Sequence, residues 1–237
     1  FEGSADNRNH AALDMLSEAY GYAEFVQQSY YPEPIAAALS YLHTNQEQPA
    51  QSQILLAVDF GGGTLDLCLI RREQSNFEVG ATHGIGLGGD HIDQVLFKKL
   101  LFPLLGKGER WKRAGEDREI ETLFPFEEYE DLLLNWAISY MLNQNKFTTP
   151  LMQRINEKDE ASIKFQRLYD MIKSNYSYLV FQCIKDLKAE LSDKETAKLD
   201  IPELDIEFDV SRDQFEVMIA DLLDRFSQSI SDLLDGV

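Results

Sequence analysis

Cysteine and long apolar runs are the two features that this sequence most clearly lacks. Only Cys68 and Cys183 occur in 237 residues, which excludes a domain stapled by several disulfides and favours two buried free thiols. No apolar run approaches the roughly 20 residues that a membrane-spanning helix needs, and the start carries no signal-peptide pattern. We therefore expect a cytoplasmic protein that has no membrane partner.

Basic residues are also scarce. The chain has 22 lysines and arginines against 41 aspartates and glutamates, so its formal net charge is −19. Because nucleic acids and anionic membranes are bound through dense basic patches, this composition argues against both as partners. The 44% of apolar residues is enough for one large or two small globular domains. The chain opens on Phe1 rather than methionine, and we expect it to be an excised piece of a longer protein.

Glycines are concentrated in two predicted turns, and the first lies between two apolar runs. In ILLAVDFGGGTLDLCLI, residues 54–70, three glycines separate two apolar runs. A hairpin turn needs positive φ, and one glycine normally suffices. Three in succession remove every side chain from the tip, so a phosphate could accept hydrogen bonds from successive N–H groups. Asp59 and Asp66 could place carboxylates near a metal ion or its waters, and Thr64 offers a hydroxyl, although turn chemistry alone also explains the pattern.

The second glycine-rich turn is HGIGLGGDHID, residues 83–93, and it leads directly into a predicted helix. Backbone N–H groups and the helix dipole favour an anion at such a helix start, and Asp90 is the expected N-cap. The pair of turns is a more specific indication of phosphate binding than either turn by itself.

Hydrophobic spacing predicts the remaining elements. The expected helices cover residues 9–20, 30–42 after a proline-rich entry, 92–100, 126–142, 161–191 and 215–234. The expected strands cover residues 23–29, 53–60, 65–72 and 77–81 with an extension to 85, and strand character returns over 197–211. Residues 102–121 are predicted to be irregular or inserted, and Ser211 with Gln214 matches a capping box.

Five segments together resemble the seventy-kilodalton heat-shock chaperones, which belong with actin and the sugar kinases in one ATPase superfamily. VDFGGGTLDLCLI is similar to the second phosphate-binding motif of that family, and PEPIAAALSY is similar to its crossing segment. GLGGDHID resembles its Leu-Gly-Gly-Glu-Asp-Phe-Asp segment, IKDLKAELS resembles its adenosine helix, and DVSRDQFEVMIADLLDRF resembles the strand and helix that follow. The order and rough spacing agree over almost the whole chain.

The resemblance implies an α/β fold, namely an actin-like ATPase (ribonuclease H-like) lobe with a mixed sheet, flanking helices and an inserted, mostly helical subdomain. Residues 1–48 would be the end of the first lobe and the crossing helix. Residues 49–87 and 205–237 would form the sheet subdomain of the second lobe, and 88–204 the inserted subdomain. The first phosphate loop with its catalytic lysine, the last adenosine motif and the substrate-binding domain of that family are absent from this sequence.

The resemblance also implies a site for ATP or ADP with Mg²⁺. Asp59, Thr64 and Glu33 would be the catalytic residues, with Asp59 and Glu33 holding the metal through water. The nucleotide contacts would come from Gly61, Gly62, Gly63, Thr64, Asp66, Gly88, Gly89, Asp90, Lys188 and Ser192. Unfolded client proteins and co-chaperones are the implied partners of the intact protein.

Four positions depart from the family pattern. Pro32 and Ile35 replace the usual Asn and Thr around the crossing glutamate, which weakens the case for the usual interdomain relay. Lys185 and Ala189 replace the family's Glu and Arg in the adenosine helix, so a ribose acceptor and a stacking guanidinium are missing. The chain is thus expected to be a divergent member with an unusually long helical insertion.

Three functions are compatible with these observations. The first is part of the nucleotide-binding domain of a heat-shock-type chaperone ATPase, active in the intact protein and inactive in this chain alone. The second is a small-molecule kinase or another actin-like ATPase, which would share the glycine hairpin. The third is a non-catalytic interaction module that keeps the fold and has lost ATP.

Overall fold

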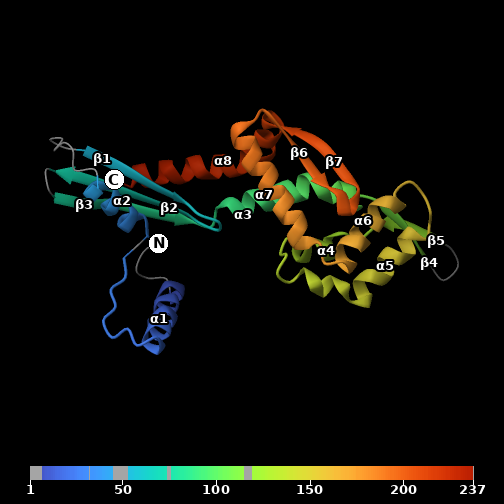
Figure 1. Ribbon diagram of the computed structural model, residues 1–237, viewed down its shortest axis with the longest axis horizontal. Coiled ribbons are helices and arrows are strands. Elements are labelled where there is room, and N and C mark those ends of the chain that lie inside the picture. Colours follow the sequence, from blue (N-terminus) through green and yellow to red (C-terminus); the bar gives the residue numbers. More distant parts are fainter. Residues whose placement is uncertain (1–6, 32, 45–52, 74–75, 115–118, 237) are drawn as a thin grey trace. The chain divides into compact units, whose positions relative to one another are not determined.

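Over the residues that it describes, the computed structural model is a mixed α/β structure with three small antiparallel sheets, shown in Figure 1. It describes residues 7–31, 33–44, 53–73, 76–114 and 119–236. Two compact units are present: unit 1 is Phe1–His91 with Asp221–Val237, and unit 2 is Ile92–Ala220. Each unit has its own hydrophobic core.

Unit 1 is built on a three-stranded antiparallel sheet. Its strands are β1 (Gln53–Phe60), β2 (Leu65–Glu73) and β3 (Asn76–Ile85), in the order β1-β2-β3. The predicted strands over 53–60 and 65–72 are confirmed, and so is the extension of the third to residue 85.

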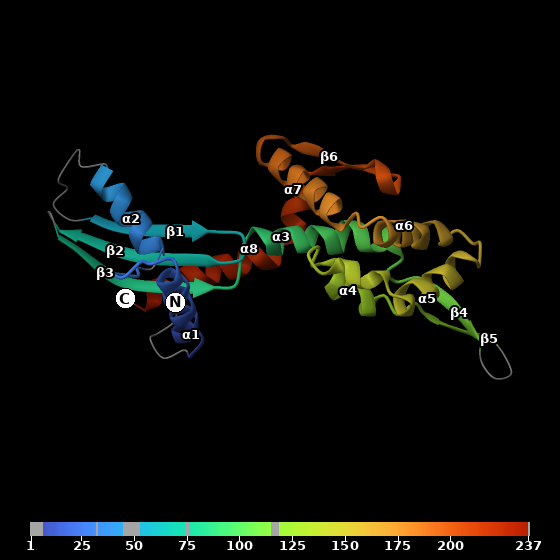
Figure 2. The same cartoon turned by 60° about the horizontal axis from the view of Figure 1, so that its bottom comes forward.

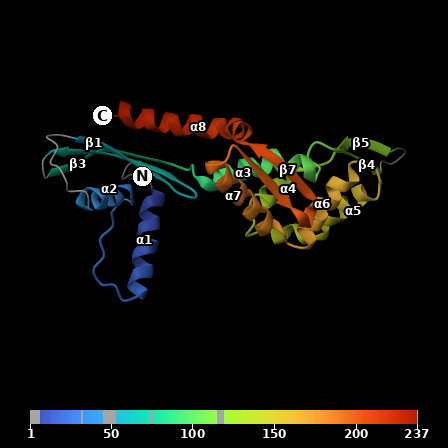
Figure 3. The ribbon, with the colours of Figure 1, turned by 45° about the horizontal axis from the view of Figure 1, so that its top comes forward.

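The central strand β2 is buried on both faces, as its continuous apolar sequence predicts. Leu65, Leu67 and Leu69 pack on one face against α8 (Arg212–Asp235), which contributes Phe226 and Leu233. Figure 2 and Figure 3 both show α8 on the opposite side of the sheet from α2 (Glu33–Thr44).

The other face of the sheet is covered by α2. Cys68 and Ile70 of β2 pack there with Ala38, and Ile35 lies against the same cluster. The alternation of side chains along β2 therefore assigns each helix to its own face. Both thiols are free; Cys68 is buried and Cys183 half-buried, and burial raises the pKa of each thiol.

The N-terminal part of unit 1 departs from the predictions in one segment. The predicted first helix is present as α1 (Asn7–Tyr22), and the proline-rich entry leads into α2 as expected. The predicted strand over 23–29 is wrong, because this segment is a turn followed by irregular chain, and Glu24 has a φ of 66°. A strand requires a hydrogen-bonded neighbour, and within the described residues each strand pairs inside one of the three sheets.

Unit 2 is mostly helical and carries two short hairpins. Its elements are α3 (Gly89–Leu96, which starts in unit 1), the short helices Phe97–Leu101 and Phe102–Leu105, β4 (Arg110–Ala114), β5 (Glu119–Leu123), α4 (Glu127–Leu133), a short helix Ser139–Asn143, α5 (Asn145–Ile155), α6 (Ser162–Lys173), α7 (Ser177–Asp193), β6 (Thr196–Ile201), a short helix Pro202–Leu204, β7 (Ile206–Ser211) and the start of α8. Aromatic rings dominate the core, among them Phe97, Phe102, Phe124, Phe126, Tyr129 and Phe165.

Two predicted helices of unit 2 are interrupted by asparagine. The predicted helix over 126–142 breaks where the Asn135 side chain accepts a hydrogen bond from the Ala137 N–H at 3.2 Å. The predicted helix over 161–191 is two helices, α6 and α7, separated at Asn175, whose φ is 55°. Asparagine adopts this left-handed conformation readily and competes for backbone hydrogen bonds, so it can end a helix despite favourable apolar spacing.

Two further predictions for unit 2 have opposite outcomes. The described residues within 102–121 are not irregular, since they form a short helix, β4 and most of β5. The capping box is confirmed: the Gln214 N–H donates to the Ser211 hydroxyl at 3.2 Å, and the Ser211 N–H donates to Gln214 Oε1 at 3.0 Å.

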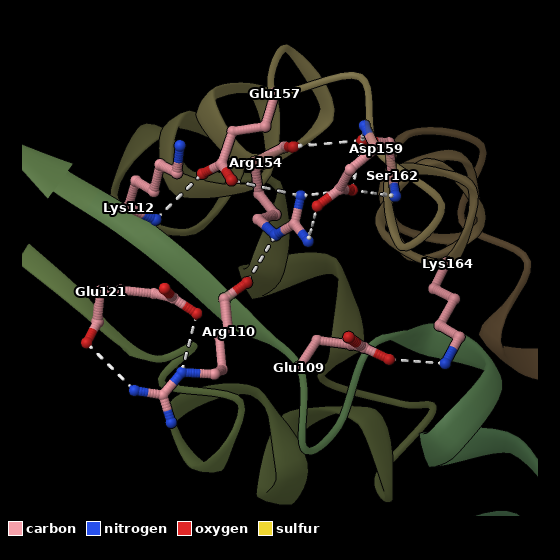
Figure 4. A network of polar contacts seen from close by, with 9 residues as sticks. All are labelled: Glu109, Arg110, Lys112, Glu121, Arg154, Glu157, Asp159, Ser162 and Lys164. Carbon is pink, nitrogen blue, oxygen red and sulfur yellow. Dashed lines mark hydrogen bonds and ion pairs between the residues drawn. The ribbon is translucent and has the colours of Figure 1, made fainter.

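A buried arginine connects the β4–β5 hairpin to the end of α5 (Figure 4). Arg154 is 2% exposed; its Nε donates to the Arg110 carbonyl at 2.7 Å, and its two terminal nitrogens donate to Asp159 at 2.8 and 2.7 Å. The neighbouring Glu157 accepts a hydrogen bond from the Lys112 N–H at 3.1 Å. Arg154 and Glu157 thus occupy one carbonyl and one N–H group of β4, which hinders the pairing of another strand at these positions.

Replacing this arginine is predicted to destabilise unit 2. The change Arg154→Met removes the donors that Arg154 supplies to Asp159 and to the Arg110 carbonyl, so we expect a loss of about 2 kcal/mol in the free energy of unfolding. Urea titration followed by tryptophan fluorescence measures this, because both tryptophans, Trp111 and Trp136, belong to unit 2. The control Arg110→Met removes an ion pair to Glu121 whose two side chains are 57% and 59% exposed, and it should cost under about 1 kcal/mol. Equal losses in the two variants would contradict the assignment.

The same pair predicts a pH dependence. Hydrogen bonds from Arg154 and Ser162 lower the pKa of Asp159 below its usual value. A depressed carboxyl pKa contributes stability above the unfolded value, near pH 4, and this contribution is lost as the pH falls through the folded pKa. The difference in stability between wild type and Arg154→Met should therefore shrink below about pH 4. Parallel unfolding curves from pH 6 to pH 3 would contradict this expectation.

Candidate functional site

The first glycine turn is a four-residue loop between β1 and β2. Phe60 pairs with Leu65, so residues 61–64 form the loop, and the Gly61 N–H donates to the Thr64 carbonyl at 2.9 Å. All four loop residues are exposed. None of the three glycines has the positive φ that a two-residue hairpin turn would need. The loop is longer than a two-residue turn, and four-residue loops commonly contain turns with negative φ.

A close approach between the two turns requires a glycine at position 88. The N–H groups of Gly89 and Asp90 donate to the carbonyls of Gly61 and Gly62 at 3.0 and 2.7 Å. A Cβ on Gly88 would lie 2.4 Å from the Gly62 carbonyl oxygen, so this position cannot carry a side chain without moving the loop. The structure thus brings these five predicted site residues together.

The start of α3 differs from the prediction in the residue at which the helix begins and in the partners of its N–H groups. The helix begins at Gly89, so Asp90 lies in its first turn and the N-cap prediction is wrong. The Gly88 N–H donates to Nδ1 of His91 at 3.2 Å, and the next two N–H groups bind the glycine loop. The N–H groups at this helix start, where we expected an anion, are therefore used within the protein: one binds His91 and two hold the first glycine turn.

Two carboxylates face each other where the hairpin enters the loop. Asp59 and Asp66 are directly opposite in the β1–β2 register, and both are half-buried. Their side chains point to the face that carries Ala57 and Cys68, since side chains alternate along a strand. Like charges opposite each other destabilise a sheet, and a cation between them would relieve this. Next to them, the Cβ position of Gly63 has no atom within 4 Å.

Glu33 is on the same face of the sheet. It is exposed and occupies the first turn of α2, which packs on β1 and β2. Among the described residues, no group of three or more histidine, cysteine, aspartate or glutamate side chains could hold a metal ion directly. A metal contact of Asp59 and Glu33 through water stays a prediction.

The predicted adenosine residues lie on α7 of unit 2. Lys188 donates from Nζ to Oδ1 of Asp93 at 2.5 Å, and the Ser192 hydroxyl donates to the Lys188 carbonyl at 3.3 Å. Lys185 and Ala189 are exposed on the same helix. Sequence reasoning did not select Asp93 for this site, because its partner is 95 residues away along the chain.

Comparisons with known proteins agree with the motifs. The family model described as "Hsp70 protein" matches residues 28–107, which include both glycine turns. The chain is 31% identical over 167 residues to chaperone protein DnaK 3 of Synechococcus sp., a region that covers 68% of this chain. It is 40% identical over 67 residues to an HscA homologue of Acinetobacter baylyi and 44% identical over 66 residues to HscA of Buchnera aphidicola.

These similarities cover only part of each protein. The two HscA matches extend over 28% and 27% of this chain. The matched regions make up 24% of the DnaK protein and 11% and 12% of the HscA proteins. The chain therefore spans about a quarter or less of these relatives. Within the described part of the chain, no helix is long and apolar enough to cross a membrane.

The contact between the turns predicts that alanine destabilises the protein much more at position 88 than at position 86. Gly88→Ala forces the loop away from α3, so we expect a loss of about 2 kcal/mol in unfolding free energy and faster exchange of the Gly89 and Asp90 amide hydrogens. The control Gly86→Ala, where a Cβ meets nothing within 4 Å, should change stability by less than about 0.5 kcal/mol. Calorimetry combined with hydrogen exchange measures both, and unaltered exchange in Gly88→Ala would disprove the close contact.

Proposed function

Because the chain belongs to the Hsp70 family over the part that the comparisons cover, we propose that it is part of a nucleotide-binding domain that holds Mg-ATP or Mg-ADP. The observation that carries this proposal is the joint placement of the glycine loop, the second glycine turn and the facing carboxylates. All three lie inside the region that the family model matches.

The loop is suited to phosphate. Gly61, Gly62 and Gly63 are exposed and have no side chains, so phosphate oxygens can approach the backbone closely. Thr64 adds a hydroxyl that can donate to a phosphate oxygen. In the proposed site these four residues hold the β and γ phosphates, and Gly88, Gly89 and Asp90 fix the loop from behind.

The carboxylates are suited to hydrated Mg²⁺. Mg²⁺ keeps several waters and prefers oxygen ligands, which suits a pair of half-buried aspartates better than a direct cage. Asp59 and Glu33 would accept hydrogen bonds from the metal waters, and Asp66 would add charge beside them. When bound, Mg²⁺ neutralises charge on the phosphate oxygens. The task of the chain's own residues is positioning, including that of the attacking water by Asp59.

The finer fold assignment belongs to the same proposal. We propose an actin-like ATPase lobe in which residues 49–87 and 205–237 form the sheet subdomain and residues 88–204 the inserted, mostly helical one. Lys188 and Ser192 would contact ribose and base. Clients and co-chaperones would be partners of the intact protein, which would hydrolyse ATP.

A non-catalytic interaction module is the second candidate. Ala189 has no polar side-chain atom, and Lys185 offers a cation where the family has a carboxylate. Both side chains are exposed on α7, so neither replacement is explained by packing in the core. Loss of adenosine contacts with retention of the fold would fit these positions.

Calorimetry on the complete gene product distinguishes the candidates. We expect heat of binding with Mg-ADP, slow ATP turnover, and negligible turnover by residues 1–237 alone, which lack the first phosphate loop. No heat with Mg-ADP or Mg-ATP would support the interaction module. Comparable turnover by the isolated chain and the complete product would refute the need for a second lobe.

The facing aspartates predict opposite effects on stability and binding. Asp66→Asn removes the repulsion with Asp59, so the ligand-free protein should gain about 0.5 kcal/mol of stability. The same change should weaken Mg-nucleotide binding by about tenfold, because one charge beside the metal waters is lost. The control Glu78→Gln alters a strand carboxylate opposite Arg71 and should leave nucleotide affinity unchanged. Melting temperature and isothermal titration measure the two effects, and a loss of both stability and affinity would indicate a purely structural role.

A further inference from the structure

A charge-free segment of unit 2 carries a group of exposed apolar side chains. Residues 132–145 contain no aspartate, glutamate, lysine or arginine, in a chain of which 27% is charged. Four exposed side chains of this segment and one tyrosine of α7 make up what we call the aromatic patch: Trp136, Ile138, Tyr140, Met141 and Tyr178. Isolated exposed apolar residues are ordinary on protein surfaces, but a group that includes several aromatic rings marks an interaction surface.

The rings of Trp136 and Tyr178 join the two parts of the patch. Their centroids are 5.4 Å apart and their planes cross at 71°, which is an edge-to-face contact. Trp136 is 49% exposed and Tyr178 is 61% exposed, so the contact leaves both rings open to solvent. Tryptophan and tyrosine are enriched among the side chains that carry most of the binding energy at protein interfaces. The two rings thus form an anchor for a partner.

Hydrogen bonds hold the turn that presents Trp136. The Asn135 side chain accepts a hydrogen bond from the Ala137 N–H at 3.2 Å, and the Ser139 hydroxyl donates to the Trp136 carbonyl at 2.9 Å. The Ile138 N–H donates to the Asn135 carbonyl at 3.1 Å. The turn is therefore ordered before a partner binds, and such preorganisation favours association.

Charges of opposite sign flank the uncharged segment. The helix α4 leads into it and exposes Glu128 and Asp131. Exposed Lys146 follows the segment, and Nζ of Lys173 donates to Oδ1 of Asn143, the last residue of the short helix, at 2.7 Å. The segment therefore has carboxylates at one end and ammonium groups at the other.

This arrangement is self-complementary. A two-fold axis sets one end of a surface against the opposite end of its copy. The carboxylates of each copy then face the ammonium groups of the other, and the aromatic rings form an apolar centre inside a polar rim. A partner with basic charge alone would instead be repelled by Lys146 and Lys173. The formal charge of −19 repels two copies at long range, but this repulsion is screened beyond about 8 Å at physiological ionic strength.

We propose that the aromatic patch is an interface through which a second copy of the protein binds around a two-fold axis. The patch lies outside residues 28–107, the segment that matches the Hsp70 model, and none of its residues belongs to the candidate nucleotide site. The inference therefore does not depend on the proposed function.

Sedimentation velocity of the complete gene product over a concentration series tests the proposal. We expect a reversible dimer with a dissociation constant of about 10 µM, because the patch is small for a stable interface. Trp136→Ala and Tyr178→Ala should each raise this constant by about tenfold or more, since each removes an anchor. The control Tyr22→Ala removes another exposed tyrosine ring, from α1 of unit 1, and should leave the constant unchanged.

An exchange of charges tests the two-fold arrangement itself. Lys146→Glu combined with Lys173→Glu puts carboxylates at both ends of the segment, whereas Glu128→Lys combined with Asp131→Lys puts lysines at both ends. Each double variant alone should dimerise about tenfold more weakly than the wild type, because like charges then face each other. An equimolar mixture of the two should recover the wild-type affinity.

Three results would overturn the proposal. The first is a wild-type protein that stays monomeric at about 100 µM, tenfold above the expected dissociation constant. The second is a dimer whose dissociation constant both alanine variants leave unchanged, and the third is a charge-exchange mixture that dimerises no better than its components. Melting temperatures establish that each variant is folded, and if Trp136→Ala is not, Tyr178→Ala carries the same test.

Discussion

The backbone contact between the two glycine turns is the constraint on which the candidate site depends. Two hydrogen bonds, from Gly89 and Asp90 to the carbonyls of Gly61 and Gly62, fix the loop and satisfy the first turn of α3 together. Because Gly88 lies against the Gly62 carbonyl, the contact requires an absent side chain on one turn and exposed carbonyls on the other. The four exposed loop residues are thereby held by the start of α3.

The rest of unit 1 stabilises a candidate site whose own residues contribute little to the free energy of folding. Facing aspartates at the end of the β1–β2 pair repel each other, and an exposed glycine loop contributes little burial. The compensation comes from β2, whose leucines and Ile70 are buried between two helices. Apolar burial on both faces of one strand thus holds charged groups in an arrangement that the strands alone would not favour.

The sequence predicted the parts that depend on local pattern. Consecutive apolar residues identified β1 and β2, glycine spacing identified both turns, and Ser211 with Gln214 identified the cap of α8. It failed where one polar side chain overrides the apolar spacing, as at Asn135 and Asn175. It could not predict the contact of Asp93 with Lys188 or the use of the α3 N–H groups by the loop, because both depend on tertiary placement.

Two buried charges in unit 2 differ in how completely they are hydrogen-bonded. The guanidinium of Arg154 is bonded through all three nitrogens to a carbonyl and a carboxylate, so the fold accounts for it fully. Asp93 is buried just as deeply but is bonded through one oxygen to a partly exposed lysine. Arg154 also lies outside residues 28–107, the segment that matches the Hsp70 model, whereas Asp93 lies inside it. Satisfied networks rigidify a fold and unsatisfied buried groups raise its energy, so the Arg154 network stabilises unit 2 whereas the Oδ2 atom of Asp93 destabilises it locally.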